Sequence, residues 1–196
     1  MIAELRIENF RCLQDFRLIL HDANPHLLIG KNGAGKSSIR SVFEILQQIC
    51  RGGRPLGDII TDSDLSFGAG ETVKIGAILQ LEKNQLSYVL CARLYDGVWE
   101  VEDETFTENE QRVVFQRKRD GIFPGTQTHI WGASEEEKTH QLDIGDKYPA
   151  LPMLGPIRSD MIGHFRDFFL SSWILGPEPS KIIDIVSTKR DFLTVD

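Results

Sequence analysis

The sequence predicts an α/β fold of the P-loop nucleotide-binding kind, with an antiparallel β-meander packed beside a glycine-rich loop. Two observations support this prediction. A short apolar segment, the glycine-rich loop and an amphipathic helix follow one another within the first 50 residues. Apolar and polar residues then alternate through most of residues 73–101, as half-buried strands require.

Three candidate strands lie in the first part of the chain. Leu5 and Ile7 alternate with charged residues within 2–10, and a second alternating segment spans 16–20. The mostly apolar residues 25–29 predict a short buried strand that leads directly into the loop.

The loop matches the pattern of Gly, four residues, then Gly-Lys-Ser, which is the phosphate-binding loop of P-loop NTPases. Glycines let successive backbone N–H groups curl around a phosphate. Lys36 can bridge the β- and γ-phosphates of ATP, and the Ser37 hydroxyl can ligate the accompanying Mg²⁺. We therefore expect ATP and Mg²⁺ as cofactors, with Ser37 as metal ligand. The expected phosphate-site residues are Gly30, Lys31, Asn32, Gly33, Ala34, Gly35, Lys36, Ser37 and Ser38.

Residues 37–50 are predicted to form a helix directly after the loop. Apolar side chains recur at positions 39, 42, 43, 46, 49 and 50, which is one face at helical spacing. Gly52 and Gly53 end it. This order places the loop at a helix N-terminus, where backbone N–H groups and the helix dipole favour phosphate.

The rest of the chain is expected to be rich in strands up to residue 150. Residues 51–72 predict a long loop, and the Asp-Gly pair at 96–97 predicts a hairpin within the meander. The acidic residues 102–110 are interpreted as a solvated edge or hairpin tip, followed by a strand near 113–119. Loops with short extended pieces are expected for 121–150.

A second helix is predicted from Ser159 onward. Met161, Ile162 and several aromatic residues recur there at helical spacing, and the Gly-Pro pair at 176–177 ends the pattern. An aromatic stripe of this kind is more often a core face than a ligand-binding surface.

The charge distribution, the cysteine spacing and the lack of long apolar runs exclude several classes of protein. The net charge of −7 divides into +3 over residues 1–54 and −10 over the rest, so the loop lies in the basic part. Overall acidity argues against a strong non-specific DNA binder. The three cysteines are far apart and lack metal-site spacing. Without a signal peptide or a long apolar run, a cytoplasmic protein with no membrane partner is expected.

The segment Leu5-Arg6-Ile7-Glu8-Asn9-Phe10-Arg11, a second strand and then the glycine-rich loop resemble the N-terminus of the SMC/RecF-like branch of the ABC ATPases. That branch includes AAA-family ATPases of the overcoming-lysogenization-defect kind. The resemblance covers about the first 50 residues. It implies a head with an antiparallel lobe and a mainly parallel sheet that carries the nucleotide. It also implies that Arg11 contacts the nucleotide, and that Lys31 and Asn32 belong to the phosphate loop.

On this resemblance the chain is expected to be the N-terminal part of an ABC-type head. Strands, loop and helix would fill 1–54, a β-rich lobe 55–150 and a helical segment 151–196. No Walker B or signature motif is present, and Asp184 is a poor Walker B candidate, so no catalytic residue is assigned. ATP binding without efficient hydrolysis is expected. The missing motifs would come from a C-terminal half or a split partner, and from a second head in an ATP-dependent homodimer. The family implies a DNA-linked role such as repair or anti-phage defence.

Two alternatives remain open. A complete small P-loop kinase, or another enzyme that uses nucleoside triphosphates, fits the length but not the two strands before the loop. A non-catalytic interaction module would not need the intact Lys36 and Ser37.

Overall fold

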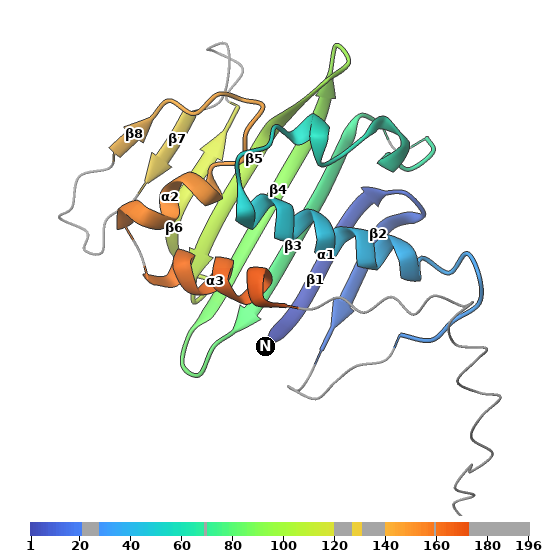
Figure 1. Ribbon diagram of the computed structural model, residues 1–196, viewed down its shortest axis with the longest axis horizontal. Coiled ribbons are helices and arrows are strands. Elements are labelled where there is room, and N and C mark those ends of the chain that lie inside the picture. Colours follow the sequence, from blue (N-terminus) through green and yellow to red (C-terminus); the bar gives the residue numbers. More distant parts are fainter. Residues whose placement is uncertain (21–27, 69, 120–126, 131–139, 159, 173–196) are drawn as a thin grey trace, which may run out of the picture.

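The structure, a computed structural model, describes residues 1–20, 28–68, 70–119, 127–130, 140–158 and 160–172. These residues form one twisted sheet with the helices on one face (Figure 1). The strands are β1 (Ile2–Phe10), β2 (Leu13–Ile19), β3 (Thr72–Gln80), β4 (Gln85–Tyr95), β5 (Val98–Glu108), β6 (Arg112–Lys118), β7 (Gln127–Ile130) and β8 (His140–Leu142). The helices are α1 (Lys36–Arg51), α2 (Leu151–Arg158) and α3 (Asp160–Ser171), with the short 3₁₀ helices η1 (Leu56–Asp58) and η2 (Asp62–Asp64).

The sheet has eight strands in the order β2-β1-β3-β4-β5-β6-β7-β8, and every neighbouring pair is antiparallel. The chain therefore adds strands outward from β3 as a meander, while β1 pairs with both β2 and β3. Alternation of apolar and polar side chains explains this arrangement, because antiparallel sheets bury one face and leave the other in water.

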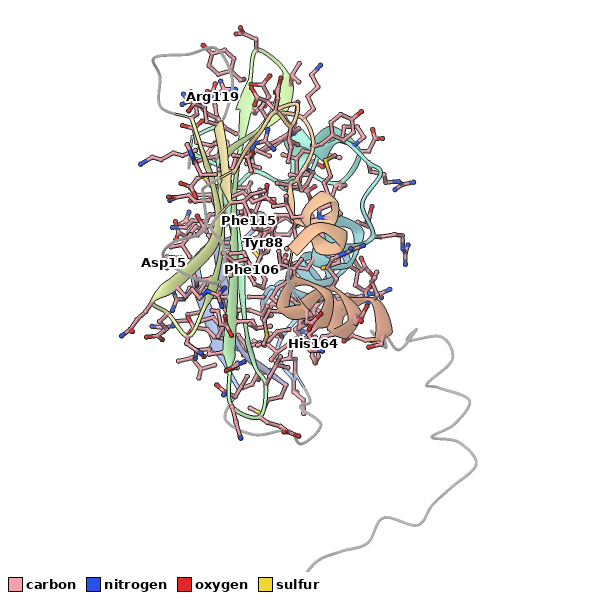
Figure 2. The ribbon with its side chains drawn as sticks, turned by 90° about the vertical axis from the view of Figure 1, so that its left-hand side faces the viewer. Asp15, Tyr88, Phe106, Phe115, Arg119 and His164 are labelled. Atoms are coloured by element: carbon pink, nitrogen blue, oxygen red, sulfur yellow. The ribbon has the colours of Figure 1, made fainter. Side chains whose placement is uncertain are left out.

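The core lies between the sheet and the helices. Most of the apolar stripe of α1 is buried there, including Val42, Leu46 and Ile49, while Phe43 is partly buried against it. Tyr88 and Phe106 of the sheet meet Phe165 of α3 with ring centroids 5.7 and 5.4 Å apart. Figure 2 shows Tyr88, Phe106 and Phe115 between the sheet and the helices. The aromatic stripe of α3 is thus a core face, as predicted.

Strands β1 to β4, β6 and helices α1 and α3 confirm the elements predicted at those places, with shifts of a few residues at their ends. Two short strands, β7 and β8, are the extended pieces expected within 121–150. The interpretation of 102–110 as an edge or hairpin tip is wrong for most of that segment. Strand β5 runs to Glu108 and pairs with β4 on one side and β6 on the other.

The reason is that Glu104 is a buried carboxylate with dedicated partners. Its oxygens accept hydrogen bonds from the backbone N–H of Ala150 at 2.7 Å, the N–H of Leu151 at 3.0 Å and the Tyr88 hydroxyl at 2.9 Å. Burial raises the pKa of Glu104, while the two N–H groups and nearby Arg117 favour its charged form. Glu104 thereby anchors the start of α2, which lies in the helical segment expected for 151–196 but ahead of the helix predicted from Ser159.

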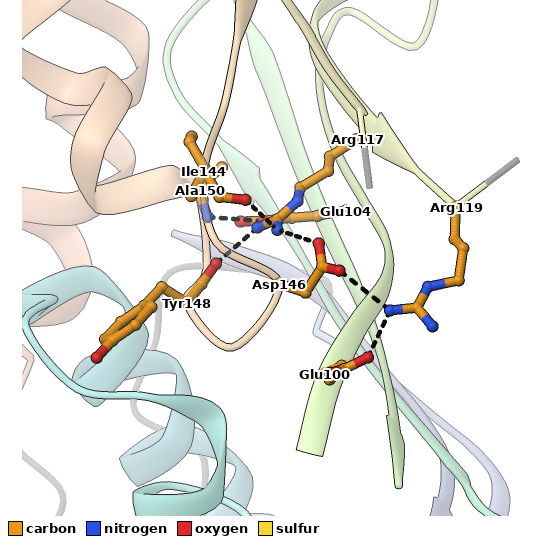
Figure 3. A network of polar contacts seen from close by, with 8 residues as sticks. All are labelled: Glu100, Glu104, Arg117, Arg119, Ile144, Asp146, Tyr148 and Ala150. Carbon is orange, nitrogen blue, oxygen red and sulfur yellow. Dashed lines mark hydrogen bonds and ion pairs between the residues drawn. The ribbon is translucent and has the colours of Figure 1, made fainter. Parts of the chain in front are cut away.

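Arg117, also fully buried, extends this network (Figure 3). Its guanidinium donates to the carbonyl oxygens of Ile144 and Tyr148 at 2.7 and 2.6 Å, and to the carboxylate of Asp146 at 3.1 Å. The segment before α2 is therefore tied to the sheet by a buried cation that satisfies otherwise unpaired carbonyls.

The mainly parallel sheet implied by the resemblance is not found among the described strands, which are all antiparallel. The strand predicted at 25–29 falls partly outside the described residues. At Leu28 and Ile29, which are described, the backbone is not in a strand, and both side chains are exposed. Asp184 and the rest of 173–196 also lie outside the described residues.

Candidate functional site

The glycine-rich loop leads directly into α1. The backbone N–H of Ala34 donates to the Lys31 carbonyl at 3.2 Å, which closes a tight turn. Gly33 and Gly35 adopt left-handed conformations with φ of +83° and +88°. Glycine is favoured at both positions because a side chain is strained there. Gly35 is also the residue that immediately precedes α1.

A cavity of about 360 Å³ opens over this loop and the first turn of α1. Its lining residues are Cys12, Asn32, Gly33, Gly35, Lys36, Ser37 and Ser38. All but Cys12 were predicted from the sequence motif. Gly30, Lys31 and Ala34 do not line the cavity. Lys31 and Ala34 close the turn, and the Gly30 carbonyl accepts from the Lys36 ammonium.

Several residues that line the cavity carry unpaired backbone N–H donors. The first hydrogen bond of α1 runs from the Ile39 N–H to the Gly35 carbonyl at 2.9 Å, so the N–H groups at the start of the helix have no helical acceptor. Within the described part of the chain, no hydrogen bond engages the N–H groups of Asn32, Gly33 or Gly35. The chemistry of such a site favours an anion.

Lys36 folds back onto its own loop. Its ammonium group donates to the carbonyl oxygens of Gly30 and Lys31, at 2.7 Å for Lys31. A lysine ammonium has three N–H donors, so one is left for a further acceptor. The side chain therefore both closes the loop and brings a positive charge to the cavity.

Two serines complete the first turn of α1. The Ser37 side chain is exposed, and no hydrogen bond to it is present within the described residues. Ser38 is buried, with its hydroxyl 3.5 Å from the Cys12 sulfur. Mg²⁺ prefers oxygen ligands and usually keeps several water ligands, so a serine hydroxyl together with phosphate oxygens of a bound nucleotide would suit it. Elsewhere in the described chain, no three His, Cys, Asp or Glu side chains gather as metal ligands.

Arg11 is placed beside the loop rather than in its cavity. Its Nε donates to Asp64 at 2.8 Å and one terminal nitrogen donates to the Ser41 hydroxyl at 2.8 Å. It is not among the residues that line the cavity.

The turn between β1 and β2 forms a wall that the sequence analysis missed. A Cβ atom at Gly35 would lie 2.9 Å from Cδ2 of Leu13 and 3.3 Å from the sulfur of Cys12. The loop and the turn are therefore in close contact. No local pattern signals this contact, because it depends on how the β1–β2 hairpin packs against α1.

A family model described as "AAA ATPase domain" matches residues 1–119, which run from β1 through β6 and include the whole loop. No curated protein matches the chain. Among the described helices, none is both long and apolar enough to cross a membrane.

Proposed function

Because the chain belongs to the AAA ATPase domain family, we propose that the loop from Gly30 to Ser38 binds the phosphates of ATP together with Mg²⁺. The observation that carries this proposal is the cavity at the start of α1, which combines unpaired backbone N–H groups with the Lys36 ammonium. Donors of this kind, fixed before the ligand arrives, recognise phosphate without a reorganisation cost.

Each group has a separate role in this proposal. The N–H groups of Asn32, Gly33 and Gly35 donate to phosphate oxygens, and Lys36 uses its third N–H as a point-charge contact to the β- and γ-phosphates. Ser37 ligates Mg²⁺, which neutralises charge on the same phosphates. Lys36 keeps its bonds to the two loop carbonyls, so phosphate binding and loop closure support one another.

We further propose that the chain is the N-terminal part of an SMC/RecF-like head. The antiparallel sheet would be its first lobe, and the nucleotide would join it to a second lobe. Leu28 and Ile29 are 43% and 83% exposed, and this apolar surface directly before the loop offers a place for the second lobe to pack.

Hydrolysis in this proposal depends on Walker B and signature motifs from a C-terminal half and from a second head in an ATP-dependent dimer. Phosphoryl transfer to water needs a positioned base and a second clamp on the γ-phosphate, and the sequence has no motif for either. In this proposal the ATPase acts in the cytoplasm, in a process linked to DNA such as repair or anti-phage defence.

Lys36→Ala tests the nucleotide site. The ATP affinity, measured by calorimetry with Mg²⁺, should fall roughly 10- to 100-fold, because a charge-assisted hydrogen bond is lost. Arg40→Ala is a matched control, since Arg40 pairs with Glu44 on the exposed side of the same helix. An unchanged affinity in the Lys36 variant would contradict the proposal.

Turnover separates the head from the small-kinase alternative. At low protein concentration, the purified chain should bind ATP with almost no hydrolysis, and a C-terminal fragment should restore hydrolysis. Fast turnover without any partner would favour the complete small enzyme.

A further inference from the structure

Residues 61–66 hold the β1–β2 turn through hydrogen bonds to Arg11. The backbone N–H of Arg11 donates to the Asp64 carbonyl at 2.6 Å, and the Ser66 hydroxyl donates to the Arg11 carbonyl. Arg11 itself has a φ of +52°, which non-glycine residues rarely adopt. The surrounding bonds therefore hold a locally unfavourable conformation.

The side chain of Arg11 connects this segment with α1. Its guanidinium bonds the buried carboxylate of Asp64 and the Ser41 hydroxyl, both at 2.8 Å. The second Asp64 oxygen accepts from the backbone N–H and the hydroxyl of Thr61, both at 2.9 Å. A buried carboxylate requires its partners, so the Arg11–Asp64 pair is costly to break.

The other side of the same turn touches the phosphate loop. Cys12 and Leu13, the next two residues, pack against Gly35, and Cys12 also lies against Ser38. A shift of the turn would therefore move the wall of the cavity. Ser41, one turn further along α1, lies at the other end of the Arg11 contact.

We propose that Arg11 is a positioning residue for nucleotide binding: it joins Asp64 to Ser41 and thereby sets the β1–β2 turn against the phosphate loop. Arg11 acts through these two partners and not through a bond of its own to the nucleotide. This inference rests on the proposed function of the loop, and it replaces the nucleotide contact that the family resemblance implies for Arg11.

The two roles of Arg11 predict opposite results when its partners are changed. If Arg11 positions the turn, Asp64→Asn and Ser41→Ala should each weaken ATP binding, by about 10-fold for Asp64→Asn and about 3-fold for Ser41→Ala, although neither residue lines the cavity. If Arg11 contacts the nucleotide directly, both variants free its guanidinium, and affinity stays equal or increases. Equal or increased affinity in both would overturn the proposal.

Double variants sharpen the test. The effects of Arg11→Ala and Ser41→Ala should not add, because both remove the same connection. Arg11→Lys should recover only part of the affinity, since one ammonium replaces a planar guanidinium that bonds both partners. Full additivity would count against the connection.

Stability controls separate positioning from a loss of fold. Ser41→Ala places the best helix former on α1, so its thermal midpoint should not fall. If Asp64→Asn does not fold, Ser41→Ala alone decides the question. Glu44→Gln, an exposed carboxylate-to-amide change on α1, should leave affinity unchanged. A wild type that binds no ATP would refute the proposed function itself, whereas ATP binding that is lost in Lys36→Ala but unaffected by the Asp64 and Ser41 changes would refute only the positioning role.

Discussion

The sulfur of Cys12 lies 3.5 Å from the hydroxyl oxygen of Ser38, and this contact joins the β1–β2 turn to the first turn of α1. Cys12 is exposed, whereas Ser38 is buried. A thiol that solvent can reach therefore stands in the wall of the candidate phosphate site, and it reports on whether that site is filled.

Nucleotide binding should protect Cys12 from thiol reagents. Saturating ATP with Mg²⁺ is expected to slow its modification about 10-fold or more, because the ligand occupies the cavity that Cys12 lines. The rate is measured by the release of thionitrobenzoate from Ellman's reagent, and Cys12→Ser should abolish the fast phase. Equal rates with and without ATP would show that the ligand does not reach this wall.

The two remaining thiols should react slowly at any ordinary pH. Burial raises the pKa of Cys50 to about 12, against a weaker opposing effect of Arg166, and burial followed by Glu102 raises the pKa of Cys91 to about 11. A raised thiol pKa means that the reactive thiolate forms only at strongly alkaline pH. The folded protein should therefore show one fast thiol from about pH 7 to about pH 9.5, and all three in guanidinium chloride. A second fast thiol within that range would contradict this burial.

Gly35→Ala should harm the protein more than Gly53→Ala, although both glycines have a positive φ, of +88° and +79°. An alanine at Gly53 meets no atom within 4 Å, so only backbone strain of about 1 kcal/mol is expected. At Gly35 the added Cβ also lies 2.9 Å from the buried Leu13 side chain. Chemical denaturation should show the larger loss for Gly35→Ala, and ATP affinity should fall in that variant alone. Similar effects of the two changes would mean that the loop tolerates displacement of the turn.

Much of the sheet could be predicted because its strands follow a simple physical rule. Val73, Ile75, Ala77 and Leu79 recur at every second position of β3, and all four are buried in the core. The loop could be recognised because phosphate binding restricts the residue types at Gly35, Lys36 and Ser37. Both signals are local in sequence.

Non-local partners explain what could not be predicted. Helix α2 contains Pro152 and Pro156, which lower helix propensity, and its N-terminus depends on a carboxylate 46 residues away in the chain. The same pairing buries Glu104, although the acidic residues around it in the sequence are typical of a solvated edge. The Arg11–Asp64 pair likewise joins residues 53 positions apart. Charge patterns along a sequence do not reveal which charged side chain has a buried partner.

Glu104→Gln should destabilise the fold even though the substituted side chain has nearly the same shape. The carboxylate accepts from two backbone N–H groups and one hydroxyl, whereas an amide offers one oxygen and turns an NH₂ group toward those donors. At least one buried N–H then loses its acceptor, which costs about 2 kcal/mol and lowers Tm by about 6 °C. Thermal unfolding followed by circular dichroism measures the shift. Glu102→Gln, on the same strand and 33% exposed at 4.0 Å from Arg93, should change Tm by about 1 °C at most. If the two variants unfold at the same temperature, the Glu104 carboxylate does not hold the start of α2, and the segment before that helix must be fixed by Arg117 alone.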